Sequence, residues 1–419
     1  MKRFTIKDLT KLTGLSRRDM LRHINGRTIS AVKTGAGYLI DEDQLALWLK
    51  NIPDINEVEN QSVFNDEYDE LDFSNCINML EVSNIKSFIS ERELLFADFF
   101  CGAGGLSRGF VEAGFKPVAY VDNFKDAIDT YKLNIIDKFN FQMEQEHKAM
   151  DITDPNIKEE LIRILNDKKL DVICGGFPCQ GFSLSGSGVA TDPRNTLYSD
   201  MLDIVAKVKP KYIVMENVMG ILSMLNGKVV KKIINDYNNI GYKVSYKVIN
   251  AANYCVPQTR KRVIFIGNCI DKNNPYPIEF LKEENFITVK EAIGFLEKKE
   301  SDVTINHLIS KHSELMKARL LEVPIGKTLY PKYADSWKKL NPNIPAYTIK
   351  ENHGAPNIHY SEPRVITAHE MALLQSFPED YFFCGCKTKQ LIQIGNAVPP
   401  QMAYAIALAL KQYIIKNNI

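Results

Sequence analysis

The stretch that decides the fold is Glu93-Leu94-Leu95-Phe96-Ala97-Asp98-Phe99-Phe100-Cys101-Gly102-Ala103-Gly104-Gly105. Its first half is an apolar run that predicts a buried strand. Its second half is a glycine turn that leads into a helical pattern through Leu106, Phe110 and Ala113. Glycines let the backbone approach a ligand closely, although tight packing of a helix on a strand selects glycine as well. Strand, glycine turn and helix together predict the first unit of a nucleotide-type α/β fold.

The following segments extend this unit. The next apolar run, 117–121, ends in Asp122, twenty residues after Gly102. An acidic side chain at this distance binds ribose hydroxyls in nucleotide-binding folds. Similar runs predict further strands over 170–175, 211–217, 243–249 and 262–267, with helices between them, for instance over 155–165, 196–207 and 227–239. The pattern indicates a doubly wound sheet that is covered on both faces.

Two chemically active side chains follow neighbouring strands of this sheet. Cys179 lies past the strand 170–175, in a loop with flanking glycines, whereas Cys174 lies within the strand and is expected to be a buried small hydrophobe. Glu216 ends the next strand. Open α/β sheets bind ligands at the carboxyl ends of their strands, so both side chains should face one cleft. A thiol and a carboxyl group there suit covalent attack with general-acid help, provided that the thiol is activated.

Four further motifs follow the glycine stretch in order along the chain. They are Phe177-Pro178-Cys179-Gln180, Glu216-Asn217-Val218, Gln258-Thr259-Arg260-Lys261-Arg262 and Gly395-Asn396-Ala397-Val398-Pro399-Pro400. The combination resembles the DNA cytosine-5 methyltransferases, over roughly residues 93–415. Each motif alone is modest evidence, but five in the family's order make coincidence a poor explanation.

The resemblance implies a Rossmann-like class I methyltransferase fold with S-adenosylmethionine as the cofactor. It implies that Cys179 adds to carbon 6 of a flipped-out cytosine, while Glu216 contacts ring nitrogen 3 and the exocyclic amine. Arg262 and Arg260 are implied to hold the base oxygen, Glu216 or a nearby phosphate, and contact with phosphate alone is the alternative for this pair. We therefore expect methyl transfer to carbon 5 of cytosine in a specific sequence of double-stranded DNA.

The cofactor residues follow from the same resemblance. They are Asp98, Phe100, Gly102, Ala103, Gly104, Gly105, Asp122, Asn123, Asp151, Ile152, Pro178, Leu197, Asn396 and Ala397. The family more often has Glu where Asp122 stands, and a bulky apolar residue where Asn123 stands. For Asp151 the alternative is a cap of the helix 155–165, a role that Thr153 or Asp154 would serve equally.

Residues 270–363 occupy the place where this family carries its target-recognition domain. Pro345-Ala346-Tyr347-Thr348-Ile349 resembles a recurring element of that domain. We expect His353 and His359 either to contact bases or to be ordinary surface residues. The stretch from Arg364 through Glu370 resembles the family's segment that folds back onto the core, so the catalytic domain should comprise 93–269 and 364–419.

The net charge of +1 hides an uneven distribution. Residues 1–50 carry +5, residues 51–85 carry −9, and the remainder carries +5. The order helix, turn, helix, hairpin, helix within 1–50 resembles a winged helix-turn-helix, and residues 51–92 should form an acidic linker. The second helix would then carry or adjoin Arg17, Arg18, Arg22 and Arg27. Two interpretations of residues 1–50 are open: a DNA-binding module that can also regulate transcription, or a structural or protein-binding module with a basic face.

Other classes are disfavoured by what the chain lacks. It has no apolar run of membrane length and no signal sequence, so we expect a cytoplasmic protein that does not bind membranes. Eight cysteines are too few for a disulfide framework, and Cys384-Gly385-Cys386 lacks a second pair of ligands, so no metal site is expected. We expect a monomer, and a cognate restriction endonuclease is a candidate partner. Methylation of tRNA on the same scaffold is the alternative activity, although the Cys-Phe-Thr tripeptide of those relatives does not occur.

Overall fold

The computed structural model describes residues 3–5, 32–34, 37–41, 93–178, 194–330, 337–350 and 356–419. The chain divides into two compact units, Met1–Ile89 and Ser90–Ile419. Within the described parts, no helix is long and apolar enough to cross a membrane.

The first unit contains a small antiparallel sheet. Its strands are β1 (Arg3–Thr5), β2 (Val32–Thr34) and β3 (Gly37–Asp41), in the order β1-β3-β2. Thr34 pairs with Gly37, which confirms the predicted hairpin, whereas β1 was not expected. The helices expected within 1–50, their arginines and the linker 51–92 lie outside the described residues.

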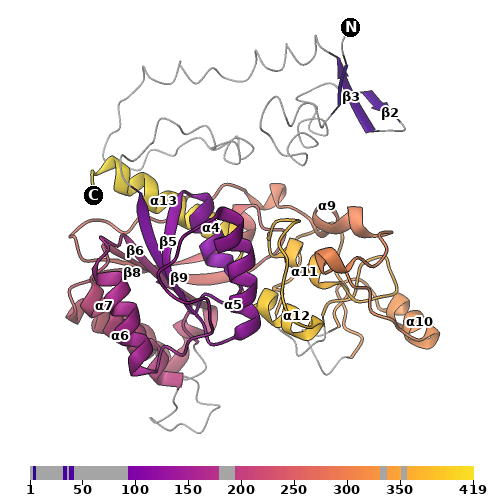
Figure 1. Cartoon of the computed structure of the whole chain (residues 1–419). Coiled ribbons are helices and arrows are strands. Elements are labelled where there is room, and N and C mark those ends of the chain that lie inside the picture. The colour runs from indigo at the N-terminus through magenta and orange to yellow at the C-terminus, as the bar shows by residue number, and fades with distance from the viewer. Residues whose placement is uncertain are drawn as a thin grey trace. The chain divides into compact units, whose positions relative to one another are not determined.

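The second unit is built on a six-stranded sheet of order β5-β4-β6-β7-β9-β8 (Figure 1). Every expected strand is present. The strands are β4 (Leu94–Phe99), β5 (Phe115–Val121), β6 (Val172–Gly175), β7 (Tyr212–Val218), β8 (Lys243–Asn250) and β9 (Lys261–Asn268). Strands β5, β4, β6 and β7 are parallel, so their carboxyl ends meet along one edge.

One detail of the expected sheet is wrong, and the strand directions, which the sequence leaves open, are given by the structure. Strand β9 runs antiparallel to both β7 and β8, so the sheet is mixed. Only residues 251–260 connect β8 to β9, and this is too short for the crossover helix that a parallel pair requires. Strand β8 is also an edge strand with several exposed residues, rather than a buried apolar run.

Helices cover both faces of the sheet (Figure 1). On one face lie α4 (Gly105–Glu112), α5 (Lys125–Tyr131) and α13 (Pro400–Lys416); on the other lie α6 (Pro155–Asn166), α7 (Arg194–Val208) and α8 (Lys228–Asn239). Strand β4 serves both cores, because Phe96 packs with the first set and its neighbour Ala97 with the second. This alternation is the ordinary consequence of the strand's period of two.

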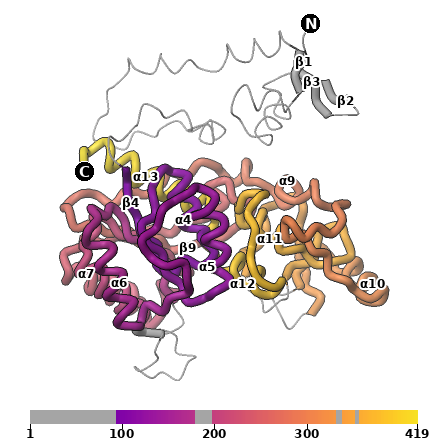
Figure 2. The backbone as a smooth tube through the Cα atoms, viewed as in Figure 1, coloured from indigo at the N-terminus to yellow at the C-terminus, as the bar shows by residue number. Residues whose placement is uncertain are grey.

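A second lobe of the same unit follows the sheet in sequence, drawn in orange and yellow in Figure 2. Its helices are α9 (Val289–Ile293), α10 (Glu314–Glu322), α11 (Ala368–Leu374) and α12 (Lys387–Asn396). The described residues also form short helical turns: η4 (Lys132–Asp137), η6 (Met219–Leu222), η7 (Met224–Gly227), η8 (Ala251–Tyr254), η9 (Glu283–Asn285), η10 (Gly294–Leu296) and η11 (Val303–Ile305). One apolar cluster joins α9 to α11 and α12 and reaches Ala103 in the glycine turn.

Candidate active site

The glycine turn after β4 has a left-handed backbone at alternate residues. The φ angles are 58° at Phe100, 51° at Gly102 and 82° at Gly104. A Cβ atom at Gly102 would meet no atom within 4 Å, whereas one at Gly104 would lie 3.0 Å from Tyr131 Cδ2. Gly104 is therefore required by packing as well as by φ, and Gly102 borders open space where a ligand can approach the backbone.

Asp122 holds this turn from the end of β5. Its Oδ2 accepts a hydrogen bond from Gly102 N at 2.9 Å, and its Oδ1 accepts one from Phe124 N at 2.8 Å. Burial raises the pKa of Asp122, and these backbone N–H groups oppose the rise. Met150 N donates to Asp122 O at 2.8 Å, which brings Asp151 to the same edge of the sheet.

Asp151 is exposed and is not the cap of α6. Its Oδ1 accepts from Thr153 N at 2.9 Å and from Thr153 Oγ1 at 2.8 Å. The cap is Asp154, whose side chain accepts from Asn156 N. Since another residue caps the helix, Asp151 is available to contact a ligand.

Asp98 lies buried beneath the turn. Its Oδ2 accepts a hydrogen bond from Ser107 Oγ at 2.6 Å, and Ser107 Oγ lies 2.8 Å from Tyr131 Oη. Burial raises the pKa of Asp98 to about 7, against the opposing effect of the Ser107 hydrogen bond. This carboxyl group therefore supports the turn from below and is partly protonated at neutral pH.

The remaining cofactor candidates border the same edge of the sheet. Ile152 is buried, Leu197 on α7 is half-buried, and Asn123, Pro178 and Asn396 are exposed. Ala397 follows α12 and is half-buried. A Cβ atom at Gly105 would lie 2.2 Å from Val398 O, so the segment after α12 packs directly on the start of α4.

Cys179 lies outside the described residues, which end at Pro178 before this loop. The residues that lead into this loop, up to Pro178, are described. Asn217 Nδ2 donates to Phe177 O at 3.0 Å, and Asn217 Oδ1 accepts from Val218 N at 2.9 Å. A Cβ atom at Gly176 would lie 3.2 Å from Glu216 Oε2, so the Glu216 carboxylate lies against the start of the Cys179 loop.

Arg262 extends from β9 to this carboxylate. Its Nε lies 2.8 Å from Glu216 Oε1, and its Nη1 donates to Lys261 O at 2.8 Å. The first contact is an ion pair rather than an aligned hydrogen bond, because that Nε has no hydrogen-bond partner among the described residues. Both side chains are about one-tenth exposed, at 10% and 12%. The antiparallel register, with Val218 opposite Arg262, creates this pairing.

Arg260 is bonded to backbone rather than to Glu216. Its Nη1 donates to Ile349 O at 2.8 Å, and its Nη2 donates to Gly395 O and Ala397 O, both at 3.1 Å. Burial lowers the pKa of Arg260 to about 9, and the nearby charge of Arg262 adds to this effect. The structure thus places Arg260 in a positioning role, in which it joins three segments that are distant in sequence.

Gln258 and Asn217 are positioning residues that sequence reasoning missed. Gln258 is fully buried, with Oε1 accepting from Ile349 N at 2.8 Å and Nε2 donating to Gln375 Oε1 at 2.8 Å. Gln258 belongs to the motif that contains Arg260 and Arg262, and Asn217 belongs to the motif that contains Glu216. Membership in these motifs could have indicated their role, because a buried amide side chain needs several hydrogen-bond partners.

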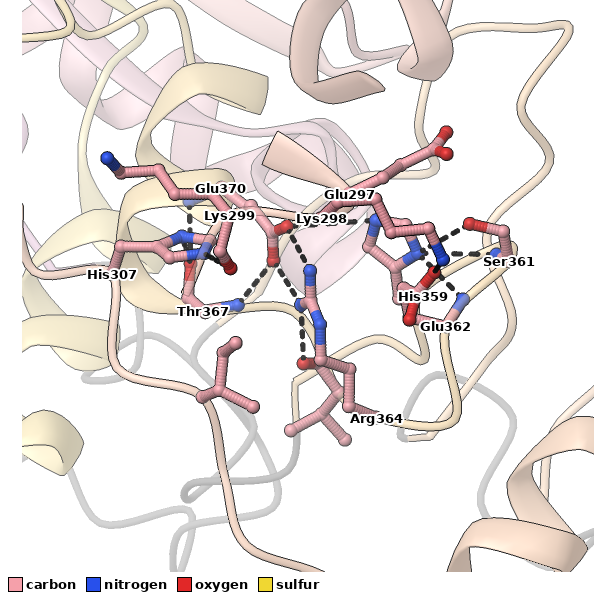
Figure 3. Close-up of polar contacts among 12 residues, drawn as sticks. Glu297, Lys298, Lys299, His307, His359, Ser361, Glu362, Arg364, Thr367 and Glu370 are labelled. Carbon is pink, nitrogen blue, oxygen red and sulfur yellow. Dashed lines mark hydrogen bonds and ion pairs between the residues drawn. The ribbon is translucent and has the colours of Figure 1, made fainter. Parts of the chain in front are cut away.

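His359 lies in a buried polar cluster where the second lobe returns to the core (Figure 3). Its Nδ1 accepts from the backbone N–H groups of Ser361 and Glu362, and its Nε2 lies 3.7 Å from Glu370 Oε1. Arg364 donates two hydrogen bonds of 2.7 Å to the same carboxylate. Because His359 is fully buried, its interpretation as a surface residue is wrong, and no edge is exposed to a base. His353 lies outside the described residues.

The described residues contain no group of His, Cys, Asp and Glu side chains that could hold a metal ion. At this edge of the sheet lies the glycine turn, in which the Gly102 amide donates to Asp122. The Glu216–Arg262 pair lies two strands away. This arrangement is typical of α/β enzymes that bind a nucleotide-containing cofactor at the carboxyl ends of their strands.

Comparison with known proteins identifies the family. The family described as C-5 cytosine-specific DNA methylase matches residues 94–412, and the chain belongs to it. The protein is accordingly an enzyme that methylates carbon 5 of cytosine in DNA, with S-adenosylmethionine as the methyl donor.

Individual relatives agree with this assignment. The Type II methyltransferase M1.HphI of Haemophilus parahaemolyticus is 36% identical over 347 residues, which cover 78% of this chain and 90% of the relative. The Type II methyltransferase M.NgoFVII of Neisseria gonorrhoeae is 32% identical, over 79% of this chain and 89% of the relative. Among solved structures, a putative DNA modification methyltransferase encoded within a prophage (E. coli) has a TM-score of 0.62 at 26% identity. It covers 78% of this chain and 100% of that chain.

Proposed function

We propose that Cys179 is the nucleophile of the methyl transfer and that Glu216 is its partner acid. The observation that carries this proposal is the position of the Glu216 carboxylate against Gly176, three residues before Cys179, with Arg262 Nε 2.8 Å away. The thiolate of Cys179 adds to carbon 6 of cytosine, which breaks the 5,6 double bond and makes carbon 5 nucleophilic. Glu216 stabilises this state through ring nitrogen 3 and the exocyclic amine.

Bound S-adenosylmethionine would supply its sulfonium methyl group to carbon 5 and leave as S-adenosylhomocysteine. Loss of the carbon 5 proton to a base, with expulsion of the Cys179 thiolate, restores the aromatic ring. Arg262 holds the Glu216 carboxylate in place and faces the base oxygen or a phosphate. Arg260 holds the segment 395–397 near the site through the carbonyl groups of Gly395 and Ala397.

For the cofactor, we propose the open side of the glycine turn. Phe100, Gly102 and Gly104 would line the methionine and ribose, and Asp122 would bind the ribose hydroxyls. Asn123, Asp151 and Ile152 lie against adenine, while Leu197 and Asn396 close the pocket. The open space at Gly102 and the exposed Asp151 support this arrangement.

For the domains, we propose that 93–269 and 364–419 form the catalytic domain and that 270–363 reads a specific sequence of double-stranded DNA. The target base is then flipped out of the duplex into the site. The module 1–50, with its helix-turn-helix-like sequence, docks on DNA or regulates transcription. Since the relatives are named Type II methyltransferases, we further propose a cytoplasmic monomer that protects DNA from a cognate restriction endonuclease.

The test is methylation of random duplex DNA by the purified enzyme, followed by bisulfite sequencing. We expect carbon 5 methylcytosine within one target sequence, and a covalent adduct with duplexes that contain 5-fluorocytosine. The Cys179→Ser variant should lose both while it retains S-adenosylhomocysteine binding, and Cys386→Ser, at an exposed thiol, should retain both. Methylation by Cys179→Ser would refute the assigned nucleophile, and methylation of tRNA but not DNA would refute the substrate.

A further inference from the structure

We infer that Tyr381 is a positioning residue for the cofactor loop, which comprises residues 100–105. We also infer that the segment 381–384 ties this loop to the region 270–363. The inference rests on the proposed cofactor role of the glycine turn and adds a residue from outside the motifs.

The Tyr381 hydroxyl is lodged directly under the loop. Tyr381 is 1% exposed, and its Oη donates a hydrogen bond of 2.5 Å to Ala103 O. A Cβ atom at Gly104 would lie 3.1 Å from the Tyr381 Oη atom. The ring packs on Phe377, with the centroids 4.7 Å apart. The phenol thus touches the loop at two consecutive residues beside the open face of Gly102.

Besides backbone hydrogen bonds such as that from Cys101 N to Val121 O, few side chains hold this loop. Within the described ranges, two side chains hydrogen-bond to the backbone of 101–104, namely Asp122 at Gly102 N and Tyr381 at Ala103 O. Asp122 lies at the end of β5, whereas Tyr381 lies 278 residues after Ala103 in the sequence. A turn with left-handed residues at 100, 102 and 104 needs such support to remain in one conformation.

The segment that carries Tyr381 is itself held at every step. The Asn134 side chain bonds to Phe382 O at 2.7 Å and to Phe382 N at 3.0 Å. Asn306, from the region 270–363, bonds to Phe383 N at 2.7 Å and to Phe383 O at 3.1 Å. Because these paired hydrogen bonds come from both lobes, they fix the position of Tyr381 relative to the loop. A displacement of Asn306 should therefore move the Tyr381 hydroxyl relative to Ala103.

The chain offers a matched control for the loss of this bond. Tyr242 is also 1% exposed, and its Oη donates a bond of 2.5 Å to a backbone carbonyl, Pro210 O, which lies before the amino end of β7. Burial raises the pKa of both phenols well above the usual range, so both hydroxyls are donors at neutral pH. Tyr381→Phe and Tyr242→Phe each remove one hydrogen bond from a buried phenol to a backbone carbonyl group, at different places in the fold.

The experiment measures S-adenosylhomocysteine binding to the full chain by calorimetry, together with thermal unfolding and steady-state kinetics. For Tyr381→Phe we expect Kd for S-adenosylhomocysteine and KM for the methyl donor to rise about three- to tenfold, the usual effect of one lost hydrogen bond, with kcat nearly unchanged. Tyr242→Phe should lower the unfolding temperature similarly and leave Kd unchanged. An unchanged Kd in Tyr381→Phe, or equal rises in both variants, would overturn the positioning role.

The tie to the region 270–363 is tested by Asn306→Gly, because glycine accepts the φ of 59° at this position. We expect a rise in Kd for S-adenosylhomocysteine although Asn306 does not touch the loop. If Kd is unchanged in this variant, the tie is overturned and the role of Tyr381 is judged by its own variant. If the unmodified protein binds no S-adenosylhomocysteine, the proposed cofactor site fails instead.

Discussion

At the scale of single residues, the Glu216–Arg262 pair concentrates the chemistry of the site. Glu216→Gln removes the charge but keeps the shape, so Arg262 loses its ion-pair partner and the cytosine ring loses the carboxyl group proposed to act at ring nitrogen 3. We expect the single-turnover rate of methyl transfer to fall about 10²- to 10⁴-fold, the usual contribution of general acid–base catalysis. Binding of S-adenosylhomocysteine should be nearly unchanged, because the glycine turn is two strands away.

Glu314→Gln is the control for this substitution. Glu314 pairs with Lys317 on the exposed surface of α10, where ion pairs contribute little. If Glu216→Gln methylates DNA as fast as Glu314→Gln, the carboxylate has no part in the reaction.

Asp98 gives the protein an unusual dependence of stability on pH. Burial raises its pKa from 3.8 to about 7, so between these values the folded state holds a proton that the unfolded chain releases. The unfolding free energy should therefore fall as pH rises from about 4 to 7 through this group, and remain level above that range. Asn at this position can still accept the Ser107 hydrogen bond but cannot ionise.

Urea unfolding of Asp98→Asn and of the unmodified protein at pH 5 and pH 7.5 measures this effect. We expect the variant to gain about 1–3 kcal/mol relative to the unmodified protein between the two pH values. A difference between the proteins that does not change with pH would show that Asp98 is ionised when folded.

The sequence predicts residues whose role follows from their own segment. Gly102 and Asp122 can be predicted as cofactor-binding residues from their own segments, because a glycine turn and a strand end indicate where a ligand can approach. Tyr381 and Asn306 could not be found in this way, because their partners depend on how distant segments pack. His359 was misjudged for the same reason, since its burial results from the cluster around Glu370 and not from its neighbours in sequence.

At the scale of elements, α4 and α13 pack more closely than their side chains suggest. A Cβ atom at Gly109 would lie 2.3 Å from Tyr404 N and 2.6 Å from Ala403 Cβ. Because backbone cannot move aside as a flexible side chain can, Gly109→Ala should lower the unfolding free energy by about 1–3 kcal/mol. Urea unfolding measures the loss.

Gly220→Ala is the matched control for this pair of helices. The nearest atom to its Cβ position is Val218 Cγ2 at 4.0 Å, so we expect almost no change in stability. Equal stability of the two variants would mean that α13 is not packed on α4 at Gly109.

The elements themselves could be predicted from the sequence, and their directions could not. Apolar runs predict the strands of the large sheet that are buried on both faces, whereas β8 has several exposed residues and does not follow this rule. The antiparallel direction of β9 agrees with the short connection 251–260, which leaves no room for a crossover helix. The edge position of β8 depends on the strand order, which no single segment reveals.

At the scale of the whole molecule, a net charge of +1 combines a basic module, an acidic stretch and a catalytic unit of +5. Attraction to DNA phosphates is local and falls within a Debye length, so the total says little about binding. We expect duplex binding by the full chain to weaken as salt increases, despite the neutral sum. Fluorescence anisotropy over a range of salt concentrations measures this slope.

The basic module is tested by replacing Arg17 and Arg18 together with Gln. If these residues contact phosphates, affinity for duplex DNA should fall and the slope of log K against log salt should become shallower by about 1–2. The control replaces Lys116 and Lys168 with Gln, which changes the net charge equally. These lysines pair with Glu93 and Glu144 near the amino ends of β5 and β6, away from the proposed cleft.

Because the two double variants have the same total charge, any difference between them reports where the charge lies. A reduced slope in the arginine variant alone would show that 1–50 docks on the duplex while the catalytic unit performs the chemistry. Equal slopes in both variants and in the unmodified protein would leave the catalytic unit as the sole DNA-binding part. In that case residues 1–50 would act on another partner.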